Sequence, residues 1–311
     1  MITNTELEYK GNLYPNEIVN FKQETDKLYF TSANGVLLQI TVLRNSMVRF
    51  RYATDYVFEP DFSYAISKNG LRGYDELNVT ETKTEYLIET IRMKVLVDKK
   101  TMRIQISDPE GNIIIEDELG FHWEENHEYG GNIVKMSKIT KTGESFYGMG
   151  DKATHSNLKG KRISNWVTDQ YAYGKDQDPL YKAIPFYVGL TENKAYGIFF
   201  DNTFKTHFDF AQEKRNVTSF WADGGEMNYY FIYGPEMEKV VRLYTNLTGT
   251  PELPPLWALG FQQSKWSYFP EARVKELAKK FRDLKIPCDG LYLDIDYMDG
   301  FRCFTWDKKL F

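Results

Sequence analysis

Three aspartates lie close together in the segment LYLDIDYMDGF, residues 291–301. Asp294 and Asp296 interrupt an apolar run typical of a strand, and Asp299 follows it. An ionised carboxylate buried without a partner costs several kcal/mol, so acids in such a run usually bind something. Carboxylates only accept hydrogen bonds, which suits sugar hydroxyls, a cation or a basic side chain. The structural alternative is that one aspartate caps the next loop and another pairs with a lysine or arginine.

The elements around these aspartates indicate a parallel strand pair. An apolar run at residues 256–262 is followed by PEARVKELAKKFRDLKIP, whose apolar residues recur at helical spacing, and then by a predicted strand at 290–295. This order predicts one βαβ unit, whose strands are parallel. Side chains alternate along a strand, so Tyr292, Asp294 and Asp296 are expected on one face. At the carboxyl end of a barrel strand, that face would line an active site.

The preceding part of the chain has a different pattern, with a period of two. In YLIETIRMKVLVDKKTMRIQIS, apolar and polar residues alternate on both sides of the turn at 98–100, and DPEGN predicts a second turn. Further strands are expected at 195–200 and 227–232. The pattern predicts a large antiparallel β-sandwich in residues 1–247. The proline-rich stretch TGTPELPPLW then opens a second domain, residues 248–311.

Composition narrows the class of protein. The 311 residues carry a net charge of −5, which argues against nucleic acid as a partner. An aromatic content of 16% in an acidic chain suits sugars, whose C–H faces stack on rings. The chain shows no signal-peptide pattern and no membrane-length apolar run, so a soluble, cytoplasmic protein is expected. The two cysteines have no metal-site spacing, and HWEENHE (residues 122–128) is expected to be a solvated hairpin.

Several stretches, in order along the chain, resemble the N-terminal portion of glycoside hydrolase family 31, the α-glucosidase/α-xylosidase family. FYGMGDK (146–152) is similar to the family's F-Y-G-x-G-E segment. NWVTDQYAYGKDQDPLYKAIPFYVGL (165–190) resembles the loop that the N-terminal sandwich sends towards the active site. PPLWALGFQQSKWSY (254–268) and IPCDGLYLDIDYMDGFRCFTWD (286–307) resemble the first two barrel strands. The resemblance is specific from about residue 146 onward, and earlier residues match only in β character.

The resemblance implies a mainly β protein, with a galactose-mutarotase-like sandwich followed by the first βαβ unit of a (β/α)8 barrel. It also implies a retaining glycosidase that needs no metal or organic cofactor and releases a terminal α-linked sugar, expected to be glucose. Two carboxyl groups about 5–5.5 Å apart perform that reaction. In the family both are aspartates on later barrel strands. The W-x-D-M-N-E nucleophile segment is absent from this sequence, so the nucleophile and acid/base are expected beyond Phe311 and the chain alone is expected to be inactive.

The resemblance assigns substrate-binding roles residue by residue. Asp294 matches the position that hydrogen-bonds the hydroxyls of the terminal sugar, and Asp169 matches the acid that the sandwich loop adds. Trp266 and Tyr292 match aromatic positions of the pocket, although the family often has Trp where this chain has Tyr292. Asp296 is expected to support the site by pairing with a neighbouring barrel residue.

Three alternatives to an α-glucosidase remain within the family: an α-xylosidase, an α-galactosidase and an α-glucan lyase. A fourth, from another class, is a non-catalytic carbohydrate-binding or assembly module. The expected partner is an α-linked oligosaccharide or glycoside. About sixty residues cannot close a barrel of some 250, so the barrel part is expected to be covered by a missing C-terminal segment or a second copy of the chain.

Overall fold

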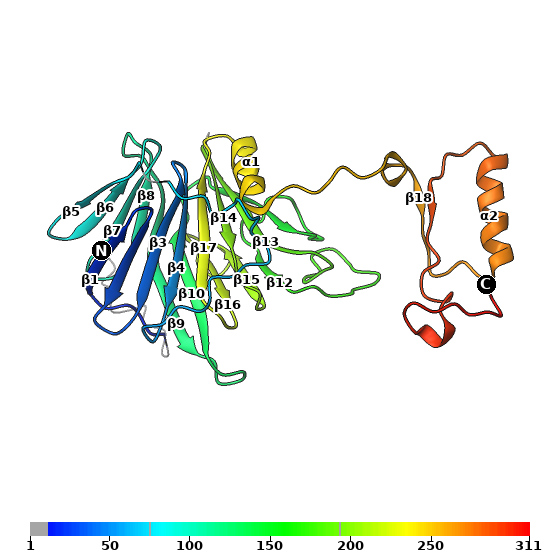
Figure 1. Ribbon diagram of the computed structural model, residues 1–311, viewed down its shortest axis with the longest axis horizontal. Helices are drawn as coiled ribbons and strands as arrows, with labels where there is room; N and C mark the ends of the chain where they lie inside the picture. Colours follow the sequence, from blue (N-terminus) through cyan, green and yellow to red (C-terminus); the bar gives the residue numbers. More distant parts are fainter. Residues whose placement is uncertain (1–11, 75, 193) are drawn as a thin grey trace. The chain divides into compact units, whose positions relative to one another are not determined.

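The computed structural model describes residues 12–74, 76–192 and 194–311. They form two compact units, one ending at Gly249 and one running from Thr250 to Phe311. Each unit is described by itself (Figure 1).

The first unit is a sandwich of two antiparallel sheets, which confirms the predicted fold class. In the described residues the first sheet has eight strands, in the order β1 (Ile18–Glu24), β2 (Lys27–Ser32), β3 (Leu37–Arg44), β4 (Met47–Ala53), β17 (Met227–Tyr233), β14 (Lys194–Phe200), β13 (Ala183–Thr191) and β11 (Ser145–Gly150). The second sheet, counted over the same residues, has nine strands, in the order β12 (Arg162–Asn165), β15 (Thr206–Phe210), β16 (Val217–Ala222), β10 (Asn132–Ile139), β9 (Ile113–Glu125), β8 (Ile104–Ser107), β7 (Lys94–Asp98), β6 (Glu85–Glu89) and β5 (Asn78–Glu81).

The alternation read from the sequence matches the burial of these strands. Along β7 and β8 the buried apolar side chains are Val95, Val97, Ile104 and Ile106, and the half-buried Leu96 and Gln105 lie between them. The turn between them is held by Asp98, whose Oδ1 accepts hydrogen bonds from the backbone N–H groups of Lys100 and Thr101. β14 and β17 confirm the strands expected at 195–200 and 227–232.

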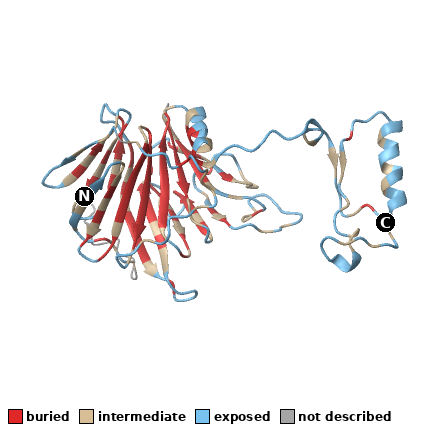
Figure 2. Ribbon diagram, in the orientation of Figure 1, coloured by how far each residue is buried: buried red, intermediate tan, exposed pale blue. Residues whose placement is uncertain are grey.

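Buried residues are concentrated in the strands of the two sheets (Figure 2, red), and many residues of the core cluster are aromatic. Phe50 stacks on Tyr229 with ring centroids 5.0 Å apart, and Phe208 stacks on Phe220 at 5.7 Å. Such ring pairs add roughly 0.5–1.5 kcal/mol each beyond the area that they bury. The high aromatic content is therefore largely structural.

Helix α1 (Met237–Thr248) covers part of the other face of the eight-stranded sheet. Its buried residues Val240, Leu243 and Leu247 pack in a second apolar cluster with side chains of β13, β14 and β17. The ring of Tyr244 stacks on Phe186 at 3.9 Å. Every residue of β17 is buried, because this strand is covered on both faces.

The second unit is a small βαβ arrangement, as predicted. Strands β18 (Gln262–Gln263) and β19 (Gly290–Leu291) pair in parallel, and α2 (Glu271–Asp283) connects them. Short 3₁₀ turns lie at η1 (Leu256–Leu259) and η2 (Asp299–Phe301). The strand expected at 256–262 is wrong over most of its length, because its apolar half forms η1. The strand expected at 290–295 is likewise shorter, ending at Leu291.

Two further findings bear on the sequence analysis. The segment HWEENHE does form the β9–β10 hairpin, but His122 and Trp123 are buried, so the expectation of a solvated hairpin is wrong there. Within the described residues, neither helix is long and apolar enough to cross a membrane.

Candidate active site

Asp169 lies on an exposed loop, residues 166–182, that joins β12 to β13. The same loop exposes Trp166, Tyr171 and Tyr173 by half or more. Tyr181 closes the loop on itself, because its hydroxyl donates to the carbonyl of Gln170 and its ring contacts Tyr173 edge-on at 6.2 Å. A carboxylate among accessible rings is the combination that a hexose requires, since hydroxyls donate to the acid and C–H faces pack on the rings.

The base of this loop is fixed by buried charge. The Nζ of Lys152 lies 2.7 Å from Oδ1 of Asp178 and donates to the carbonyl of Ser164 at 2.8 Å. The other oxygen of Asp178 accepts from the backbone N–H of Ser164 at 2.5 Å. The loop stem is therefore tied to Ser164 on β12 and to Lys152, which follows β11. Sequence reasoning missed Lys152 and Asp178, although the lysine lies within the FYGMGDK motif.

A second tie involves Asp176, on the same loop. Its Oδ1 accepts from Thr154 Oγ1 at 2.5 Å and from Lys161 Nζ at 2.9 Å, and its backbone N–H donates to Ala153 at 2.7 Å. These hydrogen bonds lower the pKa of Asp176, led by the bond from Thr154. Both ties lie on the C-terminal side of Asp169. Next to the acid, the backbone N–H of Thr168 donates to the carbonyl of Leu180 at 3.1 Å, so the two sides of the loop are also joined there.

In the second unit, the candidate residues follow the ends of the two parallel strands. Trp266 comes after β18, and Tyr292 and Asp294 come after β19. The backbone N–H of Tyr292 donates to Gln263 at 3.0 Å, and its hydroxyl donates to Oε1 of Gln262. Carboxyl ends of adjacent parallel strands lie at one edge of a sheet, so these residues start from the same edge. Gln262 and Gln263, which sequence reasoning missed, connect the two strands.

Exposure in this segment follows the predicted alternation only in part. Leu291 and Leu293 are half-buried, whereas Tyr292 and Asp294 are exposed, as a strand would have them. Asp294 has a φ of +61°, a left-handed conformation that aspartate tolerates better than most residues. The chain then turns, with Met298 N–H donating to Ile295 at 3.2 Å. Asp296 is half-buried within that turn, so its predicted place on the strand face is wrong.

The remaining candidates have simpler surroundings. Trp266 is 76% exposed, so its ring is available to a ligand rather than packed in a core. Asp299 forms an ion pair with Arg302 three residues later, which is the structural alternative considered for this acid. Across the described residues, no cluster of three or more His, Cys, Asp or Glu side chains could hold a metal ion.

Comparison with known families decides the classification. Residues 37–209 match the glycosyl hydrolase 31 N-terminal galactose mutarotase-like domain, and residues 251–311 match the glycosyl hydrolases family 31 TIM-barrel domain. The chain belongs to glycoside hydrolase family 31. The family resemblance read from the motifs is thereby confirmed for both units.

Relatives within family 31 share much of this chain. Alpha-glucosidase 2 of Bacillus thermoamyloliquefaciens is 38% identical over 238 residues, covering 76% of this chain and 30% of the relative. The alpha-glucosidase of Saccharolobus solfataricus is 38% identical over 181 residues, covering 58% of this chain and 26% of the relative. The family 31 dextranase of Flavobacterium johnsoniae, solved with isomaltotriose, aligns with a TM-score of 0.87 and 33% identity over 96% of this chain and 36% of its own. The chain thus spans about a third of the length of these relatives.

Proposed function

We propose that the protein carrying this chain is a retaining family 31 glycosidase that releases terminal α-linked glucose. The observation that carries this proposal is the 38% identity to an alpha-glucosidase along 76% of the chain. The exposed acids and rings of the loop and of the βαβ unit support it, because they offer hydrogen-bond acceptors and stacking faces. Its substrate class is an α-linked oligosaccharide or glycoside.

The chain supplies the part of the site that holds the sugar. Asp294 accepts hydrogen bonds from hydroxyls of the terminal glucose, and Asp169 adds a second acceptor from the sandwich loop. Trp266 and Tyr292 pack against the apolar faces of the sugar. Asp296, half-buried in the turn that follows, supports this segment instead of contacting sugar. The nucleophile and acid/base are supplied by a W-x-D-M-N-E segment and its partner outside these 311 residues.

The test is a panel of p-nitrophenyl α-glycosides assayed with the whole protein. We expect cleavage of the α-glucoside, and a loss of kcat/KM on the order of a hundredfold or more in D294A, because hydrogen bonds to a charged group are removed. D169A should also lower kcat/KM. D299A is the matched control and leaves kcat/KM within about twofold, since its carboxylate is paired with Arg302. An inert glucoside together with a cleaved α-xyloside would overturn the choice of glucose.

A second candidate function is cleavage inside an α-1,6-linked glucan. It is favoured by the likeness to the dextranase solved with isomaltotriose. Dextran and isomaltotriose belong in the same panel. Rapid loss of dextran viscosity with little free glucose would favour this candidate, whereas stepwise glucose release supports the first. No turnover on any α-glycoside by the whole protein would leave the non-catalytic binding module as the better description.

A further inference from the structure

A polar cavity lies on the sandwich, on the face of the eight-stranded sheet opposite the core. Along β4, Val48, Phe50 and Tyr52 belong to the core, so the alternating Arg49 and Arg51 point to the other face. A segment after β4, residues 59–64, passes over these arginines and is called the strap. The strap, the two arginines and the loops 201–204 and 225–228 line a cavity of about 190 Å³.

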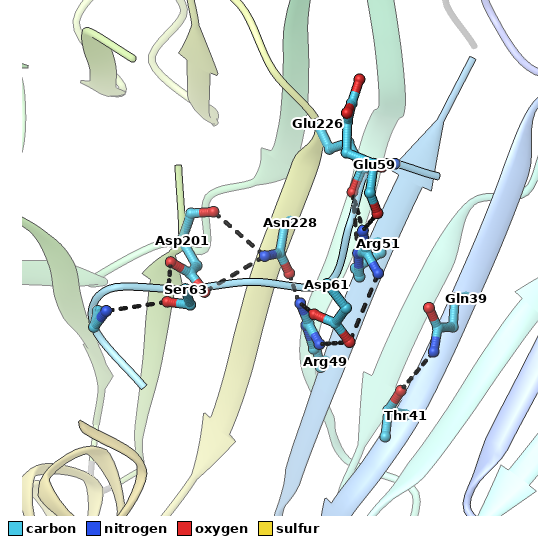
Figure 3. A network of polar contacts seen from close by, with 11 residues as sticks. Gln39, Thr41, Arg49, Arg51, Glu59, Asp61, Ser63, Asp201, Glu226 and Asn228 are labelled. Carbon is cyan, nitrogen blue, oxygen red and sulfur yellow. Dashed lines mark hydrogen bonds and ion pairs between the residues drawn. The ribbon is translucent and has the colours of Figure 1, made fainter. Parts of the chain in front are cut away.

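The strap is fastened by charged hydrogen bonds (Figure 3). Arg49 donates to both oxygens of Asp61, at 3.1 and 2.8 Å. Arg51 donates to Glu226 at 2.6 Å and to the carbonyl of Glu59 at 3.0 Å. Both arginine side chains are 5% exposed or less, so these bonds are protected from solvent. Bidentate and charge-assisted bonds of this kind fix the strap in one position.

The opposite wall of the cavity is fastened as well. The hydroxyl of Ser63 donates to Asp201 at 2.8 Å, and Asn228 Oδ1 accepts from Arg49 Nε at 2.9 Å. Asn202 donates its amide to the carbonyls of Gly224 at 2.9 Å and Glu226 at 3.1 Å. Every wall of the cavity is therefore held by hydrogen bonds before any ligand arrives, which lowers the entropic cost of binding.

Aromatic rings stand at the rim of this rigid frame. Phe62 and Tyr64 are 68% and 86% exposed, and they contact each other edge-on at 4.8 Å. Phe204, which also lines the cavity, is 52% exposed and lies next to Gly224. A Cβ added at Gly224 would stand 2.6 Å from a ring carbon of Phe204, so the absence of a side chain there sets the position of the ring.

The chemistry of the lining selects the ligand. The carboxylates of Glu59, Asp61 and Glu226, together with Asp201, outnumber the two guanidinium groups, which disfavours an anionic ligand. The side chain of Asp61 is 39% exposed, and its carboxylate keeps lone pairs free beyond the bonds from Arg49.

We propose that this cavity binds a glucosyl unit of a neutral α-glucan. The rings of the rim pack against the sugar, and Asp61 accepts hydrogen bonds from its hydroxyls. None of these residues is assigned to the proposed active site, and the proposal goes beyond the proposed function.

The test is affinity electrophoresis of the 311-residue chain in native gels containing soluble dextran or soluble starch. We expect the wild-type chain to be retarded, and Y64A and F204A each to bind about tenfold more weakly, because an exposed stacking ring is lost. G224A should weaken binding similarly by displacing Phe204 without removing it. All three positions are on the surface or in a loop, and thermal melts confirm that the variants stay folded.

Two controls separate this cavity from other sources of binding. Y129A removes an equally exposed tyrosine, 74% accessible, from the β9–β10 turn and should leave retardation unchanged. D294A removes binding at the proposed active site, and Y64A, F204A and G224A should still weaken the retardation that remains in the D294A background. An unretarded wild-type chain, or retardation that Y64A, F204A and G224A all retain, overturns the proposal. Retardation lost only in D294A overturns it too, while supporting the proposed function of Asp294.

Discussion

Lys152 and Asp178 form an ion pair, Nζ to Oδ1, of 2.7 Å at the stem of the loop that carries Asp169. Their side chains are only 6% and 17% exposed. The same two side chains also hold the backbone of Ser164 on β12 from both its N–H and its carbonyl. The position of a proposed sugar-binding acid thus depends on a salt bridge that lies in the sandwich and not in the barrel.

Replacing Lys152 by methionine should therefore destabilise the sandwich and release the loop. K152M leaves the carboxylate of Asp178 half-buried without its cation, and the expected loss in the free energy of unfolding is about 3 kcal/mol. Urea unfolding measures that loss, and limited proteolysis within residues 169–177 should become faster.

K182M is the matched control for K152M. Lys182 lies 4.0 Å from Asp151 and is 70% exposed, so its removal should change stability by less than about 0.5 kcal/mol. Equal effects of the two variants would contradict the anchoring role.

A buried charge pair inside the sandwich gives a second prediction. Lys138 Nζ lies 2.5 Å from Asp117 Oδ1 and 3.0 Å from the hydroxyl of Tyr229, with the lysine and aspartate side chains 3% and 0% exposed. K138M leaves Asp117 buried and unpaired, which should cost about 3–5 kcal/mol. The double variant K138M/D117L removes both charges and should be less destabilised than K138M alone.

The control for this comparison is a more exposed ion pair that involves the same strand, β10. Lys135 pairs with Glu124 at 2.6 Å, but their side chains are 24% and 34% exposed. K135M should cost at most about 1 kcal/mol in urea unfolding. If K138M/D117L is as unstable as K138M, the lost stability comes mainly from imperfect packing of the new side chains. The unpaired charge of Asp117 would then not be its main cause.

His122 makes the sandwich sensitive to acid. Burial lowers the pKa of His122 to about 4, although its Nδ1 lies 3.0 Å from the carbonyl of Gly120. The folded pKa is below that of the unfolded chain, about 6.5, so the unfolded state binds the proton first as the pH falls. Stability contributed by the neutral ring is complete above about pH 6.5 and is lost between about pH 6.5 and 4, by about 2–3 kcal/mol.

The variant H122N tests this pH dependence, because an asparagine amide can replace Nδ1 as donor to Gly120 but does not titrate. Its free energy of unfolding should fall less than that of the wild-type chain between pH 6.5 and 4. H127Q alters an exposed histidine in the adjoining turn and should keep the slope of the wild-type chain. Parallel curves for H122N and wild type would exclude His122 as the source.

The sandwich could be read from the sequence because each of its strands carries its own signal. In β7 and β8 the period of two and the turn formed by Asp98 are local features, so they predict both strand and hairpin. His122 was misjudged because four polar neighbours masked the continuation of β9 into Trp123. Local polarity did not reveal that this stretch of strand is covered.

The barrel elements were predicted less well for a different physical reason. A parallel strand is defined by neighbours that are distant in sequence, and in the described residues β18 and β19 pair only with each other. The apolar run at 256–259 consequently forms η1, and regular pairing ends at Leu291. The exposure of Tyr292 and Asp294 was predictable from alternation, whereas the turn that holds Asp296 was not.

The weak core of the βαβ unit leads to the last prediction. Among its described apolar residues only Tyr268 and Cys288 are buried, and α2 buries no residue fully. The ring of Phe281 in α2 contacts Phe261 with centroids 6.0 Å apart. Few buried contacts mean low-energy local opening, so amides of α2 and β19 should exchange within minutes while those of β17 remain protected for hours.

Hydrogen exchange with F281A and K280A tests this difference directly. F281A should remove the residual protection of α2 without changing the melting of the sandwich, and K280A, an exposed neighbour, should change neither. Protection of α2 as strong as that of β17 would contradict the prediction for an uncovered unit. In that case the protection should be measured at several protein concentrations. Protection supplied by a second copy of the chain is lost on dilution. Protection that does not depend on concentration belongs to the unit itself.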